Sequence, residues 1–241
     1  MRKLVLVGVI TLGVALPAWR EVAAYDAVDV KDGGAVVGEV KFAGSPPPRE
    51  KLAVNKDTEV CGKGEHLSES LIVGANGGVQ NAVVYLTNIS KGKALDGAVP
   101  NGGVDQNGCR YAPHVTLVPA KTNFNIVNND GILHNIHTYS TKNKPVNLAQ
   151  PKFKKTITQQ FEQSEFIKVT CDAHGWMSGW IVVEDHPYYA VTDQSGAFKL
   201  ADIPPGDYEV KVWHETLGEK TQKVSVKPKA ETKATFELAK K

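Results

Sequence analysis

The sequence is poor in sulfur-containing residues. It holds three cysteines, Cys61, Cys109 and Cys171, and only two methionines, of which one is the initiator. The paired C-x2-C and C-x2-C…H-x3-H elements of structural zinc sites do not occur, and neither does the C-x-x-C-H signature of covalent haem attachment. These absences exclude the usual cysteine-rich zinc sites and a c-type haem.

The sequence also lacks a strong charge and a helical pattern. Its formal net charge is +2 over 241 residues, so no electrostatic feature points to nucleic acid as a partner. No long stretch repeats its apolar residues with the helical period. Aromatic and β-branched residues occur instead in short runs between Gly, Pro, Asn and Asp. This pattern predicts an all-β protein.

The only long apolar run lies at the start of the chain. It spans residues 4–19, follows the basic residues 1–3, and precedes a small-residue motif at residues 22–24 that suits cleavage before Tyr25. The run is shorter than the roughly 20 residues of a membrane anchor. A lipoprotein is not expected either, because there is no cysteine near the cleavage point. We therefore expect residues 1–24 to be a signal peptide. The mature protein would be periplasmic or secreted, nearly neutral, and without stable membrane insertion.

Short strand candidates follow one another along the rest of the chain. A good strand is expected over Gly34–Phe42, whereas residues 50–70 and 89–108 are expected to form surface loops. His66, in the first of these loops, is expected to be solvated. The central strand candidates are Asn81–Thr87, Cys109–Val118, Asn123–Val127, Ile132–Tyr139, Lys155–Phe161, Glu165–Cys171 and Trp180–Glu184. Their spacing indicates a Greek-key sandwich or barrel, and residues 185–241 form a further meander.

An odd number of cysteines in an exported protein suggests that one thiol has a use other than a disulfide. Cys171 is the natural candidate for metal binding because a histidine and a methionine follow it closely. That leaves Cys61 to pair with Cys109, a disulfide that would stabilise the fold by about 3–4 kcal/mol. The alternative is that both are free, buried thiols.

A cluster of possible metal ligands begins at the end of one predicted strand. Cys171, His174 and Met177 lie within seven residues, and they are three of the four ligands of a trigonal copper site with a weak axial methionine. His134 is the candidate for the second imidazole. A nucleophilic Cys171–His174 pair is an alternative, but it has no role for Met177. Met177 could also be a simple core residue.

These residues resemble those of a known family. The segments that carry the resemblance are Tyr111-Ala-Pro113, Val118, Asn123, Asn128-Asn-Asp130, His134-Asn135 and Cys171-x2-His174-x2-Met177. Together they are similar to the cupredoxins, and most of all to the plastocyanin and amicyanin group. The resemblance implies one type 1 copper per chain, bound by His134, Cys171, His174 and Met177. It also implies that Asn135 braces the ligand loop.

His137 departs from that family pattern, because the relatives usually have an apolar residue there. Positions 134 and 137 of a regular strand face opposite sides, so His137 is expected to be a surface histidine near the site. A β-bulge would change this and would make His137 a possible extra ligand.

A second resemblance covers both ends of the mature chain. Its segments are Gly34–Val40, Val79–Leu86, Ala190–Phe198 and Ile203–Val210, which are similar to the carboxypeptidase regulatory-like (transthyretin-like) β-sandwich. The expected organisation is a signal peptide (1–24), N-terminal strands and loops that belong to this sandwich (25–103), a cupredoxin domain (104–184) and the rest of the sandwich (185–241). The cupredoxin would be inserted into the sandwich, as in exported cupredoxins of the methylamine-utilisation type.

The resemblance implies an electron carrier rather than an enzyme. Copper would exchange single electrons through the exposed edge of His174, beside a docking face that includes Trp176, and the partner would be a redox protein such as a c-type cytochrome or a periplasmic oxidoreductase. A protein that stores or delivers copper is the first alternative. A copper enzyme is the second, with an open site completed by His137, His186 or His214. Otherwise His186 and His214 are expected to be structural or solvated.

Overall fold

The computed structural model describes residues 25–240, and the predicted signal peptide lies outside this range. Within it, the regular structure consists of strands apart from one short α-helix, α1 (Thr58–Cys61), and one 3-10 turn, η1 (Pro100–Gly102). The prediction of an all-β protein is confirmed. None of the helical residues between 25 and 240 forms a span that is long and apolar enough to cross a membrane.

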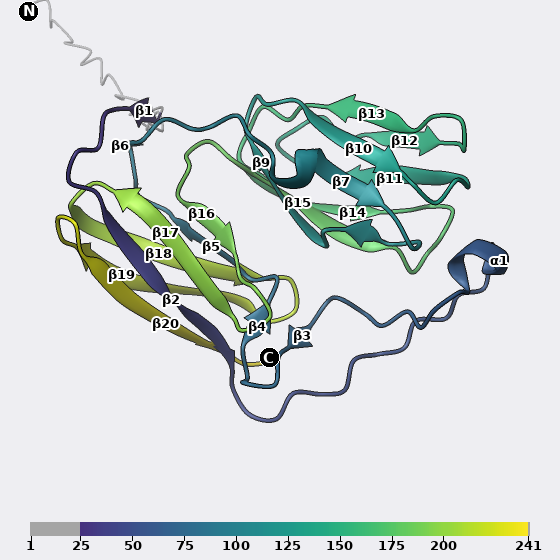
Figure 1. Ribbon diagram of the computed structural model, residues 1–241, viewed down its shortest axis with the longest axis horizontal. Coiled ribbons are helices and arrows are strands. Elements are labelled where there is room, and N and C mark those ends of the chain that lie inside the picture. The colour runs from purple at the N-terminus through teal and green to yellow at the C-terminus, as the bar shows by residue number, and fades with distance from the viewer. Residues whose placement is uncertain (1–24, 241) are drawn as a thin grey trace, which may run out of the picture.

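Two β-sandwiches make up the molecule (Figure 1). The outer sandwich consists of a four-stranded sheet in the order β16-β5-β18-β19 and a three-stranded sheet in the order β17-β2-β20. The bounds of its strands are β2 (Gly34–Phe42), β5 (Val83–Leu86), β16 (Tyr189–Val191), β17 (Ala197–Ile203), β18 (Gly206–His214), β19 (Gly218–Val226) and β20 (Glu231–Leu238). Strands from both ends of the chain therefore close one core.

The inner sandwich is built from strands that lie between β5 and β16 in the sequence. Its two sheets have the orders β13-β10-β7-β8 and β12-β11-β14-β15-β9. The bounds are β7 (Gly103–Gln106), β8 (Tyr111–Ala112), β9 (Val115–Pro119), β10 (Phe124–Asn128), β11 (His134–Tyr139), β12 (Asn147–Gln150), β13 (Thr156–Gln159), β14 (Glu165–Thr170) and β15 (Ser178–Glu184). The strands of the inner sandwich are thus inserted, in sequence, between strands of the outer one.

Alternation of side chains explains why these segments form strands. In β14, Ile167 and Val169 are buried while Lys168 between them is exposed. Successive side chains of a strand point to opposite faces, and full burial of an aliphatic side chain is worth about 1.5–3 kcal/mol. Cys171 lies two positions after Val169, just beyond the end of β14, and its side chain packs in the same hydrophobic core of the inner sandwich.

An aromatic cluster joins the two sandwiches. The ring of Trp213, from the outer sandwich, lies 4.9 Å from that of Phe166 and 4.7 Å from that of Trp180, both in the inner sandwich. Beside them, the Nε2 atom of buried His114 is hydrogen-bonded to Glu215 across the same boundary. The packed rings and this hydrogen bond connect the inner sandwich with the outer one.

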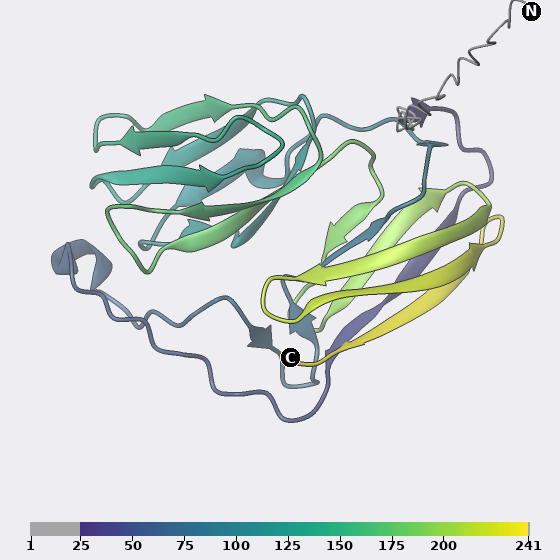
Figure 2. The ribbon, with the colours of Figure 1, turned by 180° about the vertical axis from the view of Figure 1, so that it is seen from behind.

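The segment from 49 to 69, which we call the connecting segment, departs from the prediction of a plain surface loop. Its outgoing and returning limbs pair with each other at Lys51 and Leu67, and α1 forms its tip, beside the end of the inner sandwich (Figures 1 and 2). Cys61 is buried in the inner core. Although residues 25–103 were expected to belong to the outer sandwich, this part of them packs on the inner one.

Several strands differ from the sequence prediction. β2 has the expected bounds, but the strand expected over Cys109–Val118 is divided into β8 and β9 at Pro113, which cannot donate to a sheet ladder. β7 lies in a region that was expected to be a loop, and no strand was expected at β12. The residues of β7 are polar or glycine at three of four positions, and β12 is an edge strand with two of its four residues exposed, so neither has a clear hydrophobic signal.

Glu184 lies at the end of β15, where the chain leaves the inner sandwich, and its side chain is buried. Burial and the neighbouring charge of Asp185 raise the pKa of Glu184 to about 8, from an ordinary value of 4.5. Between these two pH values the folded protein binds more protons than the unfolded chain, so stability falls as pH rises.

We expect Glu184→Gln to remove this loss, because glutamine keeps the shape of the side chain and cannot ionise. Urea unfolding of the wild type should show stability decreasing from pH 5 to pH 8 by up to about 1.4 kcal/mol per unit from this group. The variant should lack this part of the decrease. Parallel pH profiles for the two proteins would contradict the prediction, and Glu162→Gln, an exposed position, provides the control.

Candidate metal centre

Three potential ligands converge at one end of the inner sandwich. The Nδ1 atoms of His134 and His174 are 2.9 Å apart, and the Sγ atom of Cys171 lies 4.0 Å from the first and 3.7 Å from the second. All three side chains are buried. A triangle with these sides fits one metal ion bonded to imidazole nitrogen and thiolate sulfur at roughly 2.0 and 2.3 Å, as is typical of such ligands.

The strands of one sheet place these atoms. His134 is the first residue of β11, and Cys171 directly follows β14, the strand that pairs with β11. The loop from Cys171 to Met177 is closed by two backbone hydrogen bonds: Met177 N–H donates to His174 O (2.9 Å), and Cys171 N–H donates to Met177 O (3.3 Å). These bonds bring the two ends of the loop together and place His174 on the same side as Cys171.

Each imidazole has a carboxylate on its far side. The Nε2 atom of His134 lies 2.8 Å from Asp130 Oδ2, and the Nε2 atom of His174 lies 2.8 Å from Asp57 Oδ2. A hydrogen bond at Nε2 orients the ring and turns Nδ1 toward the site, which is how carboxylates behind metal-binding histidines support them. Both Nδ1 atoms thus face the sulfur of Cys171.

The electrostatics of the site favour an ionised thiol. Burial would raise the pKa of Cys171, but hydrogen bonds with His134 and with backbone groups outweigh it and lower that pKa. Burial would lower the pKa of His134, but Asp130 and the Cys171 sulfur outweigh it and raise that pKa to about 9. Burial lowers the pKa of His174 despite its bond to Asp57. The thiolate that these shifts favour at Cys171 is the form that binds metal.

Asn135 braces the ligand loop from the neighbouring strand. Its Oδ1 atom accepts hydrogen bonds from Asp172 N–H (2.6 Å) and Ala173 N–H (3.4 Å). Its Nδ2 group donates to Asn147 Oδ1 at 2.7 Å, and Asn147 in turn donates to the Asp172 carboxylate. Asn135 is therefore located where the resemblance had placed the residue that holds the loop.

Met177 and Trp176 lie in the same loop. Met177 is buried, with only 1% of its surface exposed, and packs in the inner core with Cys171. Trp176 is half-buried: its ring centroid lies 5.0 Å from that of His174, and its Nε1–H donates to Cys109 O at 3.1 Å. Trp176 thus connects one candidate ligand with the protein surface.

His137 lies apart from the three converging atoms. It is on the same strand as His134 but half-exposed, with its Nδ1 atom 2.9 Å from Asp172 Oδ1 and its ring stacked on Tyr139. β11 is regular through this region in its pairing with β12, so no bulge turns His137 inward.

Two expectations about histidine exposure were wrong. The ring edge of His174 was expected to be exposed, yet His174 is completely buried, because Asp57 and the connecting segment lie over it. His66 was expected to be solvated, but it is half-buried, with Nε2 hydrogen-bonded to Cys61 O at 2.7 Å. The sequence offers no periodicity that would have linked residue 57 to residue 174.

His186 and His214 are both buried, and both contact residues of the outer sandwich. The Nε2 atom of His186 is 2.9 Å from Leu86 O, and His214 ends β18 with its Nδ1 atom facing the following backbone amides. Their contacts are those of structural residues, and neither belongs to the group formed by His134, Cys171 and His174.

Several solved structures resemble part of the chain. A copper-containing nitrite reductase from Thermus scotoductus SA-01 is 21% identical with a TM-score of 0.30, and the match covers 34% of this chain and 22% of the reductase. An amicyanin variant in its oxidised state is 22% identical with a TM-score of 0.32, and the match covers 38% of this chain and 86% of the amicyanin. A purple cupredoxin from Nitrosopumilus maritimus is 24% identical with a TM-score of 0.27, and the match covers 31% of this chain and 81% of the cupredoxin. The chain thus spans about a fifth of the reductase.

A family described as polysaccharide lyase family 4, domain II, matches residues 163–234. This range includes the last two strands of the inner sandwich, β14 and β15, and most of the C-terminal strands of the outer one. It covers less than half of the chain. None of the curated proteins compared with the chain matches it. The chain is therefore described by its own architecture, a β-sandwich that carries another β-sandwich as an insert.

Proposed function

We propose that this protein is an exported type 1 copper protein that transfers single electrons between redox partners. The observation that carries the proposal is the buried triangle of two imidazole nitrogens and one cysteine sulfur. A His2Cys trigonal set with a weak axial methionine is the donor set of blue-copper electron-transfer sites. When bound there, copper would supply a one-electron couple between Cu(I) and Cu(II).

The protein's own residues would hold the ion and limit rearrangement around it. His134, Cys171 and His174 would be the strong ligands, and Met177, in the same closed loop, would be the weak axial one. Asn135 and the two backbone bonds of the loop keep these side chains in place. A preorganised, water-excluded site suits electron transfer, because little has to move when the charge changes.

Export is part of the proposal. The Cys61–Cys109 disulfide supports it, because disulfides persist in oxidising compartments such as the periplasm and the extracellular space. The partner would be a redox protein, for example a c-type cytochrome or a periplasmic oxidoreductase, and Trp176 would lie on the path of the electron. We do not propose nucleic acid or a membrane as partners.

The test is a spectrum of the copper-reconstituted mature chain, residues 25–241. We expect Cu(II) to produce an intense thiolate-to-copper charge-transfer band in the visible region and the narrow copper hyperfine splitting of a type 1 site in electron paramagnetic resonance. Zn(II) loading, which gives no such band, is the control. A colourless Cu(II) protein, or a spectrum typical of nitrogen and oxygen ligands alone, would contradict the proposal.

One observation favours a second function, storage or delivery of copper. His174 is completely buried beneath Asp57, and a covered ligand suits a protein that holds its ion more than one that exchanges electrons at that edge. Reduction potential and exchange rate discriminate between the two. Reversible cycling with rapid exchange supports the electron carrier, whereas slow or irreversible cycling together with tight Cu(I) binding supports delivery.

A further inference from the structure

The connecting segment reaches the candidate metal centre from outside the inner sandwich. Asp57, at its tip, places Oδ2 2.8 Å from the Nε2 atom of His174, although the two residues are 117 positions apart. His174 is completely buried, whereas 40% of the Asp57 side chain stays exposed. The carboxylate of Asp57 therefore lies between the Nε2 edge of the imidazole and solvent.

The side chain of Asp57 is directed to the imidazole rather than to its own helix. Asp57 precedes α1 in a left-handed conformation (φ 48°, ψ 42°), which aspartate adopts more readily than most residues, and its side chain makes no capping hydrogen bond to the helix. Aspartate at this position normally accepts a hydrogen bond from a helix N–H group. The carboxylate of Asp57 contacts His174 instead.

A disulfide connects this carboxylate with the one on the other imidazole. Cys61, four residues after Asp57, is bonded to Cys109. Cys109 N–H donates to Asp130 Oδ2 at 2.8 Å, the same oxygen that contacts His134. The carboxylates behind both imidazoles are therefore held by the two halves of one disulfide.

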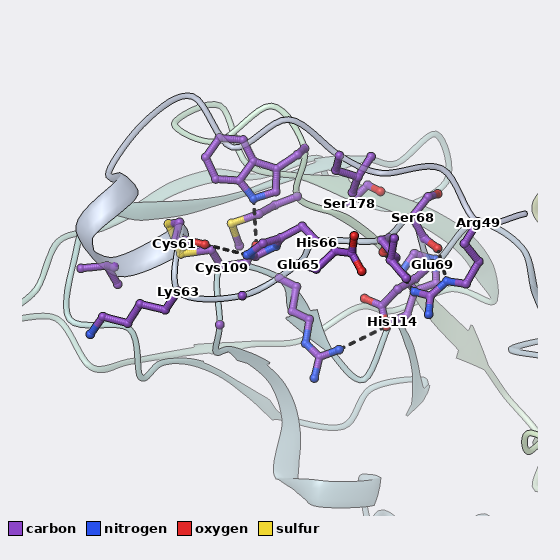
Figure 3. Close-up of a pocket in the computed structure, with 18 residues that line it drawn as sticks. Arg49, Cys61, Lys63, Glu65, His66, Ser68, Glu69, Cys109, His114 and Ser178 are labelled. Carbon is purple, nitrogen blue, oxygen red and sulfur yellow. Dashed lines mark hydrogen bonds and ion pairs between the residues drawn. A yellow bond between two sulfur atoms is a disulfide. The ribbon is translucent and has the colours of Figure 1, made fainter.

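The disulfide also lies beside the open side of the ligand loop. A cavity of about 460 Å³ extends between the connecting segment and the inner sandwich, and Cys61, Cys109, Trp176 and Met177 are among the residues that line it. Figure 3 shows the disulfide at one end of this cavity, with His66 next to it. Trp176 and Met177 thus bring the ligand loop to the wall of this cavity.

We propose that Asp57 is a positioning residue for the metal site, delivered by the connecting segment as a disulfide-tethered cover that fixes the His174 ring and closes its edge to partners. The inference rests on the proposed copper function and deepens it. Asp57 would stabilise Cu(II) more than Cu(I), because a carboxylate behind the imidazole increases the electron donation of the ligand to the more highly charged ion.

The first test compares Asp57→Asn with the wild type after loading with copper. We expect the visible band to remain, Cu(II) affinity to fall about 10–100-fold, and the reduction potential to rise. For each tenfold loss of Cu(II) affinity relative to Cu(I) affinity, the reduction potential rises by about 59 mV. Glu59→Gln is the matched control, since it removes the same charge from the same helix at an exposed position and should leave the potential unchanged.

The second test measures the cover itself in the metal-free protein. A histidine-modifying reagent followed by peptide mass spectrometry should leave His174 unmodified in the wild type. It should modify His174 in Asp57→Ala, and also in a Cys61→Ala/Cys109→Ala variant that retains Asp57. His137, which is half-exposed, is the internal standard for reagent activity.

The outcomes separate this inference from the proposed function. A wild-type protein without a type 1 spectrum overturns the proposed function, and the modification assay then still decides whether the segment covers His174. A type 1 spectrum with equal potentials in Asp57→Asn and Glu59→Gln overturns the positioning role. Rapid modification of His174 in the wild type overturns the cover.

Discussion

Replacing Cys171 with serine is expected to abolish the intense visible band of the copper-loaded protein. The band depends on a thiolate bonded to Cu(II), and a serine hydroxyl is neither ionised at neutral pH nor a soft ligand. Affinity for Cu(II) should fall by more than about 100-fold, the upper end of the losses that follow changes outside the ligand shell. Visible absorption and competition with a chelator of known affinity measure the two effects.

His137→Gln is the control for this experiment, because His137 lies outside the buried triangle and interacts with Asp172 instead. Its band and affinity should match those of the wild type. A band that survives in Cys171→Ser would show that another residue holds the copper, and a band lost in His137→Gln would place that histidine in the site.

Removal of the Cys61–Cys109 disulfide is expected to produce the largest loss of stability. The bond closes a loop with a sequence separation of 48, for which the chain-entropy estimate is about 4 kcal/mol. Replacement of both cysteines with alanine should lower the urea midpoint and increase the slope, because the unfolded chain without the crosslink is less compact and exposes more surface. Both side chains are buried, so alanine suits the site better than serine.

The wild type unfolded in the presence of a reductant provides the comparison for the double variant. Cys171 is the remaining cysteine and is free, so the reductant acts on this one disulfide, and the two unfolding curves should coincide. An unchanged midpoint in both would mean that the connecting segment contributes little to the stability of the inner sandwich.

The architecture could be predicted from the sequence where the signal is local. Alternating side chains define β2 and β14, and the expected bounds of β2 agree with the structure. The proximity of Cys171 and His174 follows from their spacing in one loop after a strand. The insertion could be predicted because segments at both ends of the chain resemble one sandwich.

The features of the candidate site that the sequence did not predict depend on contacts between residues far apart in the chain. Asp57 contacts His174 across 117 positions, and no periodicity or spacing in the sequence reports such a pairing. Asp130 lies four residues before His134 in a turn, so it could have been suspected, but a turn aspartate is common. The exposed edge expected for His174 was wrong for the same reason, because the group that covers it arrives from another part of the chain.

The inserted arrangement sets an order on how the chain can assemble. β2 pairs in parallel with β20, the last of the described strands, and β5 lies between β16 and β18. During synthesis, β2 and β5 therefore emerge long before their partners, and their backbone groups stay unpaired meanwhile. The last strand of the inner sandwich ends at Glu184. All strands of the inner sandwich are therefore synthesised before the C-terminal strands of the outer sandwich. Unpaired strands promote aggregation, so this protein would depend most on chaperones in the interval before residues 189–238 arrive.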